Sequence, residues 1–322
     1  MISRMLFALA VLAAALPPSA WAQAYPSRPV RVIVTFPPGG TPDIYGRVMS
    51  AELQKIWNQP VVVENRTGAS GSIGTDLVAK SAPDGYTLLF AADATITVIP
   101  HLLTKLPYDP VRDFAPVVNV AAGPFVLLAH PSFPANSVKE LIALVRSQPG
   151  RISYASSGSG SQQHLAMESI RTMAGNMDMI HIPYKGFGQG IADVLANQVP
   201  LIFGGITASI QLTRGGKVKA LGVTGPMRAK ALPNVPAIAE TLPGFDITAW
   251  YGFLAPAGTP REIVKKIHDD AVAVIRRPDF LERLDRDGID PVANSPEEFA
   301  AQIRTDLARW SKVVKAAGAK LD

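Results

Sequence analysis

The 322-residue chain contains no cysteine. This absence excludes thiol chemistry, a disulfide framework and a metal site built on cysteine sulfur. Basic residues are scattered and the net charge is only +5, so we do not expect nucleic acid as a partner. Beyond the N-terminal segment, no stretch approaches the roughly 18 uninterrupted apolar residues of a membrane span. These absences leave a globular protein without thiol chemistry and without the footprint of a nucleic-acid-binding protein.

Motifs for common catalytic chemistry are also missing. The glycine runs fit neither G-x-G-x-x-G nor G-x-x-x-x-G-K-[ST], and no serine has glycine at both −2 and +2. The five histidines are scattered without H-E-x-x-H spacing. We therefore predict no metal, no cofactor and no enzymatic activity. An exported hydrolase is the least favoured alternative, because the sequence assembles no nucleophile with a base.

The N-terminus has the organisation of a signal peptide. Arg4 precedes an apolar segment, Met5–Leu16, that is too short to cross a bilayer as a mature helix. Ala20-Trp21-Ala22 supplies the small residues that signal peptidase recognises. We expect residues 1–22 to be removed by cleavage after Ala22 and the mature chain to be exported. An uncleaved membrane anchor is the alternative.

Short β-branched apolar segments alternate with helical patterns along the rest of the chain. The segments are apolar at both odd and even positions, as expected of strands covered on both faces. The predicted strands are Val30–Thr35, Pro60–Val63, Tyr86–Phe90, Phe125–Ala129, Ile152–Ala155, Met179–Ile182, Val199–Phe203 and Lys219–Val223. This alternation predicts an α/β fold with mixed, mostly parallel sheets flanked by helices.

Three predicted helices begin with capping signals. Ser137-x-x-Glu140 and Ser295-Pro296-x-Glu298 have the spacing of a capping box, and Thr259-Pro260-x-Glu262 places proline at the first helical position. The last signal in the chain opens a long C-terminal helix with an apolar stripe.

The chain is long for a single doubly wound sheet, so we predict two lobes. The crossings between the lobes are placed near residues 122–130 and 222–252. The domain assignment that follows is lobe 1 over residues 23–123 plus 240–322, and lobe 2 over residues 124–239.

The stretch FPPGGTPDIYGR, residues 36–47, predicts an anion-binding corner. Thr41 is a candidate N-cap, Pro42 suits the first helical position, and Asp43 in the first turn suits the helix dipole. Gly39 and Gly40 allow the backbone to approach a ligand closely. Free N–H groups at a helix start attract an anion without a lysine.

Two further glycine- and serine-rich loops precede helices, at residues 65–80 and 154–170. Because open α/β sheets bind ligands beyond the carboxyl ends of their strands, the loops together predict a small carboxylate held between the lobes. The plain alternative is that each loop is an ordinary strand–helix turn. His164 and Asp93 are candidate site residues, with a structural hydrogen bond and a helix cap as their respective alternatives.

Several motifs, in order along nearly the whole chain, resemble the Bug family of periplasmic substrate-binding proteins of tripartite tricarboxylate transporters. They include FPPGGTPDIYGR, VVVENRTGASGSIGTDLVAKSAPDGYTLL, LPYDPVRDFAPV, YASSGSGSQQHLA, HIPYKG, LPNVPAIAE and LPGFDITAWYGFLAPAGTP. The resemblance implies a two-lobed periplasmic-binding-protein fold of type II-like topology that closes on one carboxylate. It also implies a periplasmic location, a monomer, and delivery of the ligand to a permease with one large and one small membrane subunit.

The resemblance also implies which residues contact the ligand. In lobe 1 these are Phe36, Gly39, Gly40, Thr41 and Asp43, with the segment Ala92, Asp93 and Ala94. In lobe 2 they are Ser157, Gly158, Ser159, Ser161 and the Phe203–Gly204 turn, and His164 is added as a candidate beside them.

The sequence departs from the family pattern at positions that would affect ligand choice. Gly204-Gly205 stands where the family often has aspartate, and Asp93 stands where small polar residues are common. The glycines would widen the site, and Asp93 would favour a ligand with an N–H group or a protonated end. The alternative function is a ligand-binding accessory of an extracytoplasmic sensor kinase, which the sequence does not separate from transport.

Overall fold

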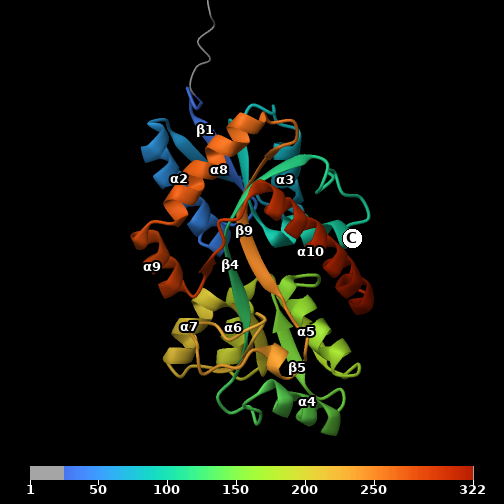
Figure 1. Cartoon of the computed structure of the whole chain (residues 1–322). Coiled ribbons are helices and arrows are strands. Elements are labelled where there is room, and N and C mark those ends of the chain that lie inside the picture. The colour runs from blue at the N-terminus through green and yellow to red at the C-terminus, as the bar shows by residue number, and fades with distance from the viewer. Residues whose placement is uncertain (1–24, 322) are drawn as a thin grey trace, which may run out of the picture.

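The computed structural model describes residues 25–321, which form two lobes (Figure 1). The upper lobe holds β1 (Val30–Val34), β2 (Val61–Asn65), β3 (Thr87–Ala92), α2 (Thr41–Trp57), α3 (Ser72–Ala79), α8 (Arg261–Ile275), α9 (Pro278–Asp287) and α10 (Pro296–Ala317). The lower lobe holds α4 (Val138–Ser147), β5 (Ser153–Ser156), α5 (Gln162–Met173), β6 (Ile180–Pro183), α6 (Phe187–Leu195), β7 (Leu201–Gly205), α7 (Ile206–Arg214) and β8 (Lys219–Val223). The predicted α/β, two-lobed architecture is confirmed.

Two long strands link the lobes. β4 (Phe114–Ala129) pairs antiparallel with β9 (Thr248–Pro256) through its first part, and with β7 and β8 through its last five residues. The strand order is β2-β1-β3-β9-β4-β7-β5-β6, with β8 and the short β10 (Asp290–Pro291) also paired to β4. The domain boundaries at residues 123 and 239 stay a prediction.

The other strands follow parallel α/β rules. β1 pairs in parallel with β2 and β3, and β5 pairs in parallel with β6 and β7. The carboxyl ends of neighbouring parallel strands share one edge of a sheet, where ligands of open α/β sheets bind. Most of the predicted ligand residues follow β1, β3 and β5. The others are Ala92 at the end of β3, His164 in α5, and Phe203 and Gly204 in β7.

Apart from the two-residue β10, two strand segments have no counterpart among the sequence predictions. The first half of β4 contains Pro116, and β-bulges near Pro116 and Asn119 accommodate the irregular register. β9 is buried along most of its length, so its sequence shows no alternation of apolar and polar residues. Proline and the missing alternation explain why local pattern did not reveal these strands.

The N-cap residues in the structure agree with two of the capping predictions and differ from two others. The Ser137 hydroxyl accepts from the Glu140 N–H, and Ser295 forms a complete capping box with Glu298, as predicted. At α8 the prediction is wrong: the N-cap is Pro260, and the Thr259 hydroxyl donates to the Pro256 carbonyl instead. At α2 the N-cap is Gly40, and Thr41 is the first helical residue rather than the cap.

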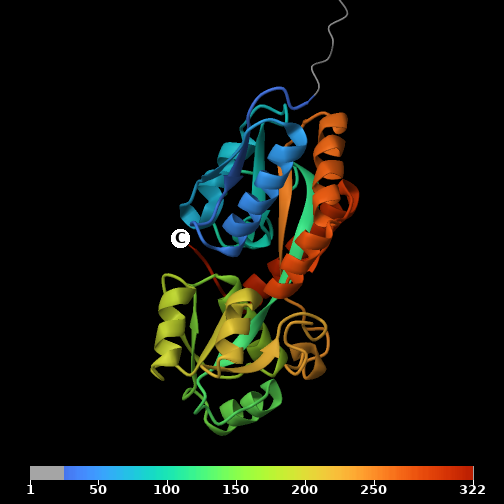
Figure 2. The same ribbon diagram turned by 90° about the vertical axis from the view of Figure 1, so that its left-hand side faces the viewer.

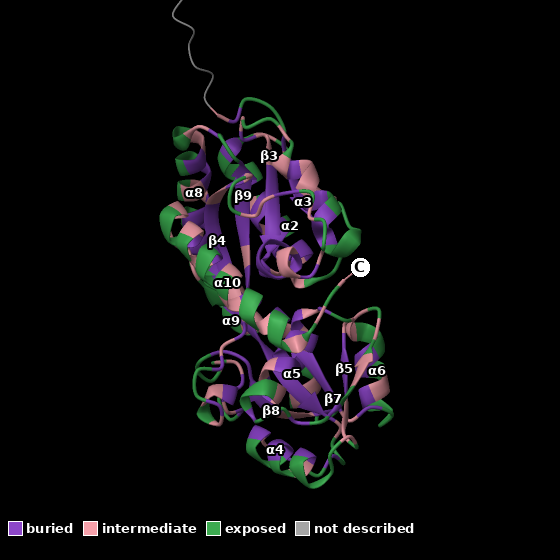
Figure 3. Ribbon diagram, turned by 90° about the vertical axis from the view of Figure 1, so that its right-hand side faces the viewer, coloured by how far each residue is buried: buried purple, intermediate pink, exposed green. Residues whose placement is uncertain are grey.

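Helix α10 packs into apolar clusters of both lobes. Phe299 and Ile303 pack in a cluster with Ile33, Leu89 and other upper-lobe residues. Further along α10, Trp310 packs in a second cluster that includes much of the lower-lobe core. Figure 3 shows α10 running across the junction with a buried inner face and an exposed outer face. In the side view of Figure 2 the C-terminus also lies at the level of this junction.

Within residues 25–321, no helix combines the length and the apolar character that a membrane crossing demands. Two predictions, the signal peptide over residues 1–22 and its cleavage after Ala22, lie outside the described residues.

Short helices connect some of the longer elements. Three of them are 3₁₀ turns: η1 (Ala69–Gly71), η3 (Ile99–His101) and η4 (Ile238–Glu240). The segment η2 (Ala94–Val98) is a π-helix that begins directly after β3.

Candidate ligand site at the strand ends

The corner between β1 and α2 is organised by Asp43. Its carboxylate accepts from the Gly39 N–H at 3.0 Å, from Arg47 Nε at 2.9 Å and from Asn65 Nδ2 at 2.8 Å. Burial alone would raise the pKa of Asp43, but these hydrogen bonds hold it below its usual range. The contacts of the Asp43 carboxylate are therefore internal, and its observed role is to fix the loop.

The two glycines of this corner differ in conformation. Gly39 has φ +87°, which disfavours any L side chain, and its N–H is already engaged by Asp43. Gly40 has φ −75° and ψ 160°, an ordinary extended conformation, and it is exposed. A Cβ on Gly40 would meet nothing closer than 3.6 Å. The absence of a side chain at Gly40 is therefore not required by the fold.

Asp93 stands directly beyond β3 and connects the two lobes. It is 1% exposed, and Gln162 in the first turn of α5 donates from Nε2 to its Oδ2 at 2.5 Å. Burial, reinforced by the negative charge of Asp306, raises the pKa of Asp93 to about 8. Ala92 ends β3 and Ala94 begins η2, so this segment lies where lobe 1 meets the start of α5.

Tyr251 on β9 links Asp93 to the β1–α2 corner. Ala92 pairs with Tyr251 across the sheet. Burial raises the pKa of the Tyr251 phenol most, and the charge of Asp93 raises it further. A hydrogen bond with the Thr41 hydroxyl lowers it. Thr41, Tyr251 and Asp93 are therefore close neighbours, although they come from three separate segments of the chain.

The lower lobe contributes the loop after β5. Gly158 has φ +119°, and its N–H donates to the Ser156 hydroxyl at 3.1 Å. Ser161 caps α5 by accepting from the His164 N–H. Ser159 is exposed, whereas the Ser157 hydroxyl oxygen is buried without a partner among the described residues.

Two of the predicted residues have evident structural roles. The His164 ring accepts from the Gly160 N–H at 3.1 Å and stacks on His181 with 4.0 Å between ring centroids. Burial lowers its pKa. Phe203 is fully buried in the lower-lobe core.

Phe203 and Gly204 are part of strand β7 and do not form the predicted turn, because the strand continues to Gly205. A Cβ on Gly204 would come within 2.8 Å of the Phe187 ring and the Ser209 hydroxyl. The close packing of Phe187 and Ser209 explains this glycine, while Gly205 has open space around it.

Unpartnered oxygens follow three of the strands. Within residues 25–321, Thr35 Oγ1 after β1, Asp93 Oδ1 after β3 and Ser157 Oγ after β5 are buried and have no hydrogen-bond partner. Buried polar groups are normally hydrogen-bonded, so each of these three atoms has the capacity for a further hydrogen bond. These atoms belong to both lobes: Asp93 and Ser157 are among the residues predicted from the sequence, and Thr35 directly precedes the first predicted loop.

Sequence reasoning missed three residues of this region: Thr35, Gln162 and Tyr251. Thr35 was available as the polar end of a predicted apolar strand, and Gln162 as the first helical residue after a Ser/Gly loop. Tyr251 belongs to a quoted family motif, but no strand was predicted there. None of the three carries a local motif that reports a binding role.

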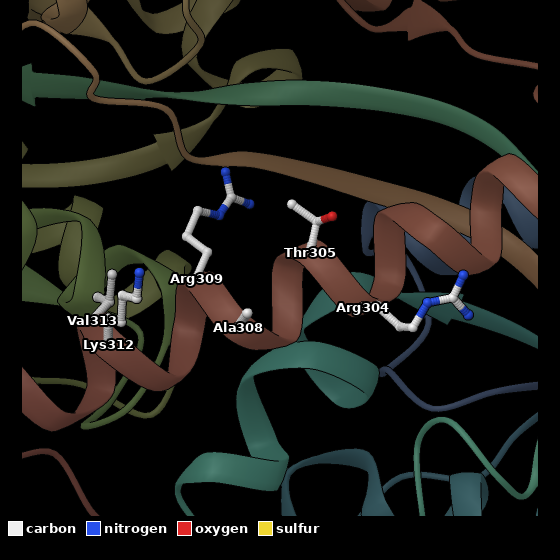
Figure 4. A pocket seen from close by; sticks show the side chains of 6 residues that line it. All are labelled: Arg304, Thr305, Ala308, Arg309, Lys312 and Val313. Atoms are coloured by element: carbon white, nitrogen blue, oxygen red, sulfur yellow. The ribbon is translucent and has the colours of Figure 1, made fainter.

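A separate pocket of about 650 Å³ lies against α10. Its lining residues, shown in Figure 4, are Arg304, Thr305, Ala308, Arg309, Lys312 and Val313. Arg309 donates to the Asp306 carboxylate at 2.9 Å and to the Asp246 carbonyl at 2.9 Å. This pocket therefore borders the joint made by α10 and is distinct from the strand-end residues.

The strand-end region offers neutral donors and acceptors. Over residues 25–321 the structure brings together no group of three or more histidine or acidic residues placed to hold a metal ion. Hydroxyls, backbone N–H groups at the starts of α2 and α5, and the protonatable Asp93 are suited to bind a small polar anion.

A profile of the family described as "Tripartite tricarboxylate transporter family receptor" matches residues 45–319. Among individual proteins, the chain is 37% identical over 305 residues to Protein BugT of Bordetella pertussis, covering 93% of this chain and 92% of that protein.

Two solved structures of similar proteins contain carboxylates. Rpa4515 of R. palustris with adipate is 34% identical with a TM-score of 0.83, over 92% of this chain and 99% of that one. MatC from Rhodopseudomonas palustris with bound malate is 32% identical with a TM-score of 0.79, over 90% of this chain and 100% of that one.

Proposed function

The chain belongs to the tripartite tricarboxylate transporter receptor family, and we propose that it captures one small organic acid and delivers it to a permease of that transporter class. Receptors of this family are periplasmic solute-binding proteins, and the solved relatives hold adipate and malate. By this proposal the chain has no chemistry of its own. The energy of ligand binding favours the closed arrangement of the lobes.

The observation that carries the proposal is the set of unpartnered buried oxygens after β1, β3 and β5. By this proposal, these positions supply polar partners from both lobes to a molecule placed between them. No positively charged side chain is among the predicted contacts, which suits binding by backbone dipoles and hydroxyls. We infer an aliphatic mono- or dicarboxylate as the ligand class.

Calorimetric titration of the purified mature chain tests the proposal. Adipate and malate are the probes, and 1,6-diaminohexane is the control that keeps a six-carbon chain without carboxylates. We expect saturable binding of at least one acid with one site per chain, and no binding of the diamine. Absence of binding across a broad panel of mono-, di- and tricarboxylates would contradict the proposal.

Gly40→Ala tests whether the ligand approaches the start of α2. The fold accommodates the added methyl group, because its nearest neighbour would lie at 3.6 Å and the backbone is in an ordinary region. We expect carboxylate affinity to fall by about tenfold, the effect of disturbing one charge-assisted hydrogen bond. Ser311→Ala, on the exposed face of α10, is the control and should bind as the unaltered chain does.

Delivery to a permease is tested separately by uptake of labelled acid into cells. Deleting the gene for this protein should abolish uptake at low substrate concentration, and re-expression should restore it. If the protein binds the acid but its loss leaves uptake unchanged, the transport part of the proposal fails and the binding part stands.

A further inference from the structure

Asp93 is an acid buried where the two lobes meet. Asp93 directly follows Ala92, the last residue of β3, and its Oδ2 accepts a hydrogen bond from Gln162 Nε2 at the start of α5. Its Oδ1 is also buried, and no described residue bonds to it. One oxygen therefore connects the lobes, and the other is buried without a hydrogen-bond partner among residues 25–321.

The groups around Asp93 provide little compensation for a negative charge. Asp306 on α10 adds a second acid, although its own carboxylate is held by Trp250 Nε1 at 3.0 Å and by Arg309 at 2.9 Å. Tyr251 on β9 is neutral because burial raises its pKa. The Gln162 amide, the positive charge of Arg309 and the Ala94 N–H each lower the pKa of Asp93, but by less than burial and the charge of Asp306 raise it.

A buried carboxylate without a cation in contact is costly, and such a group retains its proton instead. Within residues 25–321, no salt bridge involves Asp93. The raised pKa, about 8, agrees with this geometry. Burial without a cation in contact therefore favours the protonated form of Asp93.

Oδ2 is already paired with the Gln162 amide, whose Nε2 donates to it. With that pairing, the proton of a neutral Asp93 belongs on Oδ1, the oxygen without a hydrogen-bond partner among residues 25–321. We propose that the Asp93 Oδ1–H group donates a hydrogen bond to a carboxylate oxygen of the bound ligand, and that Asp93 thereby selects ligands with an acceptor at this point. This inference rests on the proposed carboxylate-binding function.

The proposal reverses the simplest expectation for an acidic side chain. An ionised aspartate would favour a ligand with an ammonium or N–H group, as expected from the sequence alone. A protonated Asp93 instead favours an acceptor oxygen and adds no repulsion against an anion. Acids with a carboxylate or hydroxyl oxygen placed to meet Oδ1 are therefore preferred over analogues with an amine at the same position.

The pH dependence of adipate binding tests the proposal. Both adipate carboxyls are ionised from about pH 6 to about pH 10, so the ligand itself does not titrate. We expect the affinity of the unaltered chain to fall about tenfold between about pH 6.5 and about pH 9.5, as Asp93 loses its donor proton.

Two variants at position 93 distinguish the effect of the hydrogen-bond donor from the effect of side-chain size. Asp93→Asn retains an N–H donor at every pH, so it should bind adipate nearly as well as the unaltered chain at about pH 6.5 and show no loss at about pH 9.5. Asp93→Ala should bind about tenfold more weakly at both values. The matched control is Asp285→Asn, an exposed acid on α9 that should retain the original profile. Asp93→Asn binding as weakly as Asp93→Ala, or titrating like the unaltered chain, would overturn the proposal.

A ligand-free measurement distinguishes failure of this proposal from failure of the proposed function. Infrared difference spectra between the unaltered chain and Asp93→Asn at neutral pH should show a carboxylic-acid C=O band that is absent from the variant. A carboxylate band in its place overturns the neutral Asp93 whatever the ligand. If the acid band is present but no carboxylate binds, the proposed function fails, and the donor role fails with it.

Discussion

At the scale of single residues, two aspartates of the candidate site show opposite behaviour. Asp43 receives hydrogen bonds from a backbone N–H, an arginine and an asparagine, and its pKa is lowered. Asp93 receives one amide donor in a fully buried place, and its pKa is raised. The same residue type therefore fixes a loop as an anion in one position and is a proton donor in the other.

The raised pKa of Asp93 predicts how the free energy of unfolding changes with pH. The folded chain retains a proton that the unfolded chain releases near pH 3.8, so the contribution of Asp93 to stability decreases as pH rises from about 4 to about 8. Asp93→Asn removes this penalty. Its free energy of unfolding relative to the unaltered chain should therefore increase by roughly 2–4 kcal/mol between about pH 5 and about pH 8.

Urea unfolding of both proteins at the two pH values measures this difference. Asp285→Asn serves again as the control, and its relative stability should change little with pH. A difference between Asp93→Asn and the unaltered chain that stays constant with pH would show that Asp93 is ionised in the folded protein.

At the scale of elements, α10 is the helix that links apolar clusters of the two lobes. Its first half packs with upper-lobe residues through Phe299, and its second half packs through Trp310 with the cluster that contains the lower-lobe core. Ser295 and Glu298 satisfy the first backbone N–H groups in a complete capping box. The stability of this one helix start therefore affects the connection between both lobes.

Ser295→Ala should lower the free energy of unfolding by about 1 kcal/mol, the usual cost of losing an N-cap. The matched control on the same helix is Ser311→Ala, at an exposed interior position where alanine is the better helix former. Thermal unfolding of both variants measures the effect. Equal midpoints for the two variants would show that the cap contributes nothing to the stability of α10.

At the scale of the whole molecule, the two lobes are joined by β4, β9 and α10 (Figure 1). Hinge closure requires a few segments that absorb rotation while the lobes remain rigid. The point at which β4 changes partners, from β9 at Pro124 to β7 at Phe125, and the segment before β9 have the position for this role. The buried Asp93–Gln162 hydrogen bond also crosses the junction between the lobes.

Small-angle X-ray scattering tests whether ligand binding closes the lobes. Saturating adipate should decrease the radius of gyration of the unaltered chain, because bound ligand favours the closed arrangement. A variant with weakened binding, Gly40→Ala, should need more adipate to reach the same decrease. Unchanged scattering at full saturation would show that the ligand binds without lobe closure.

The sequence predicted most strands, the family and the loops around the site, because these depend on local patterns. Apolar β-branched runs, serine caps and glycine-rich loops each act over a few neighbouring residues. The predictions failed where other influences dominated. Pro116 obscured the first half of β4, and the Thr259 hydroxyl was engaged by the Pro256 carbonyl instead of the helix start.

The sequence alone determined the α/β class, the family and the positions of the candidate loops, since periodicity and motifs are local properties. Only the tertiary structure decided which side chains those loops present. In the folded chain, the Asp43 carboxylate is hydrogen-bonded within the β1–α2 corner, and Phe203 is buried in the core. Gln162 donates a hydrogen bond to Asp93, which lies 69 residues earlier in the sequence. The protonation of Asp93 follows from that placement, because burial and neighbouring charges depend on contacts between segments far apart in the chain.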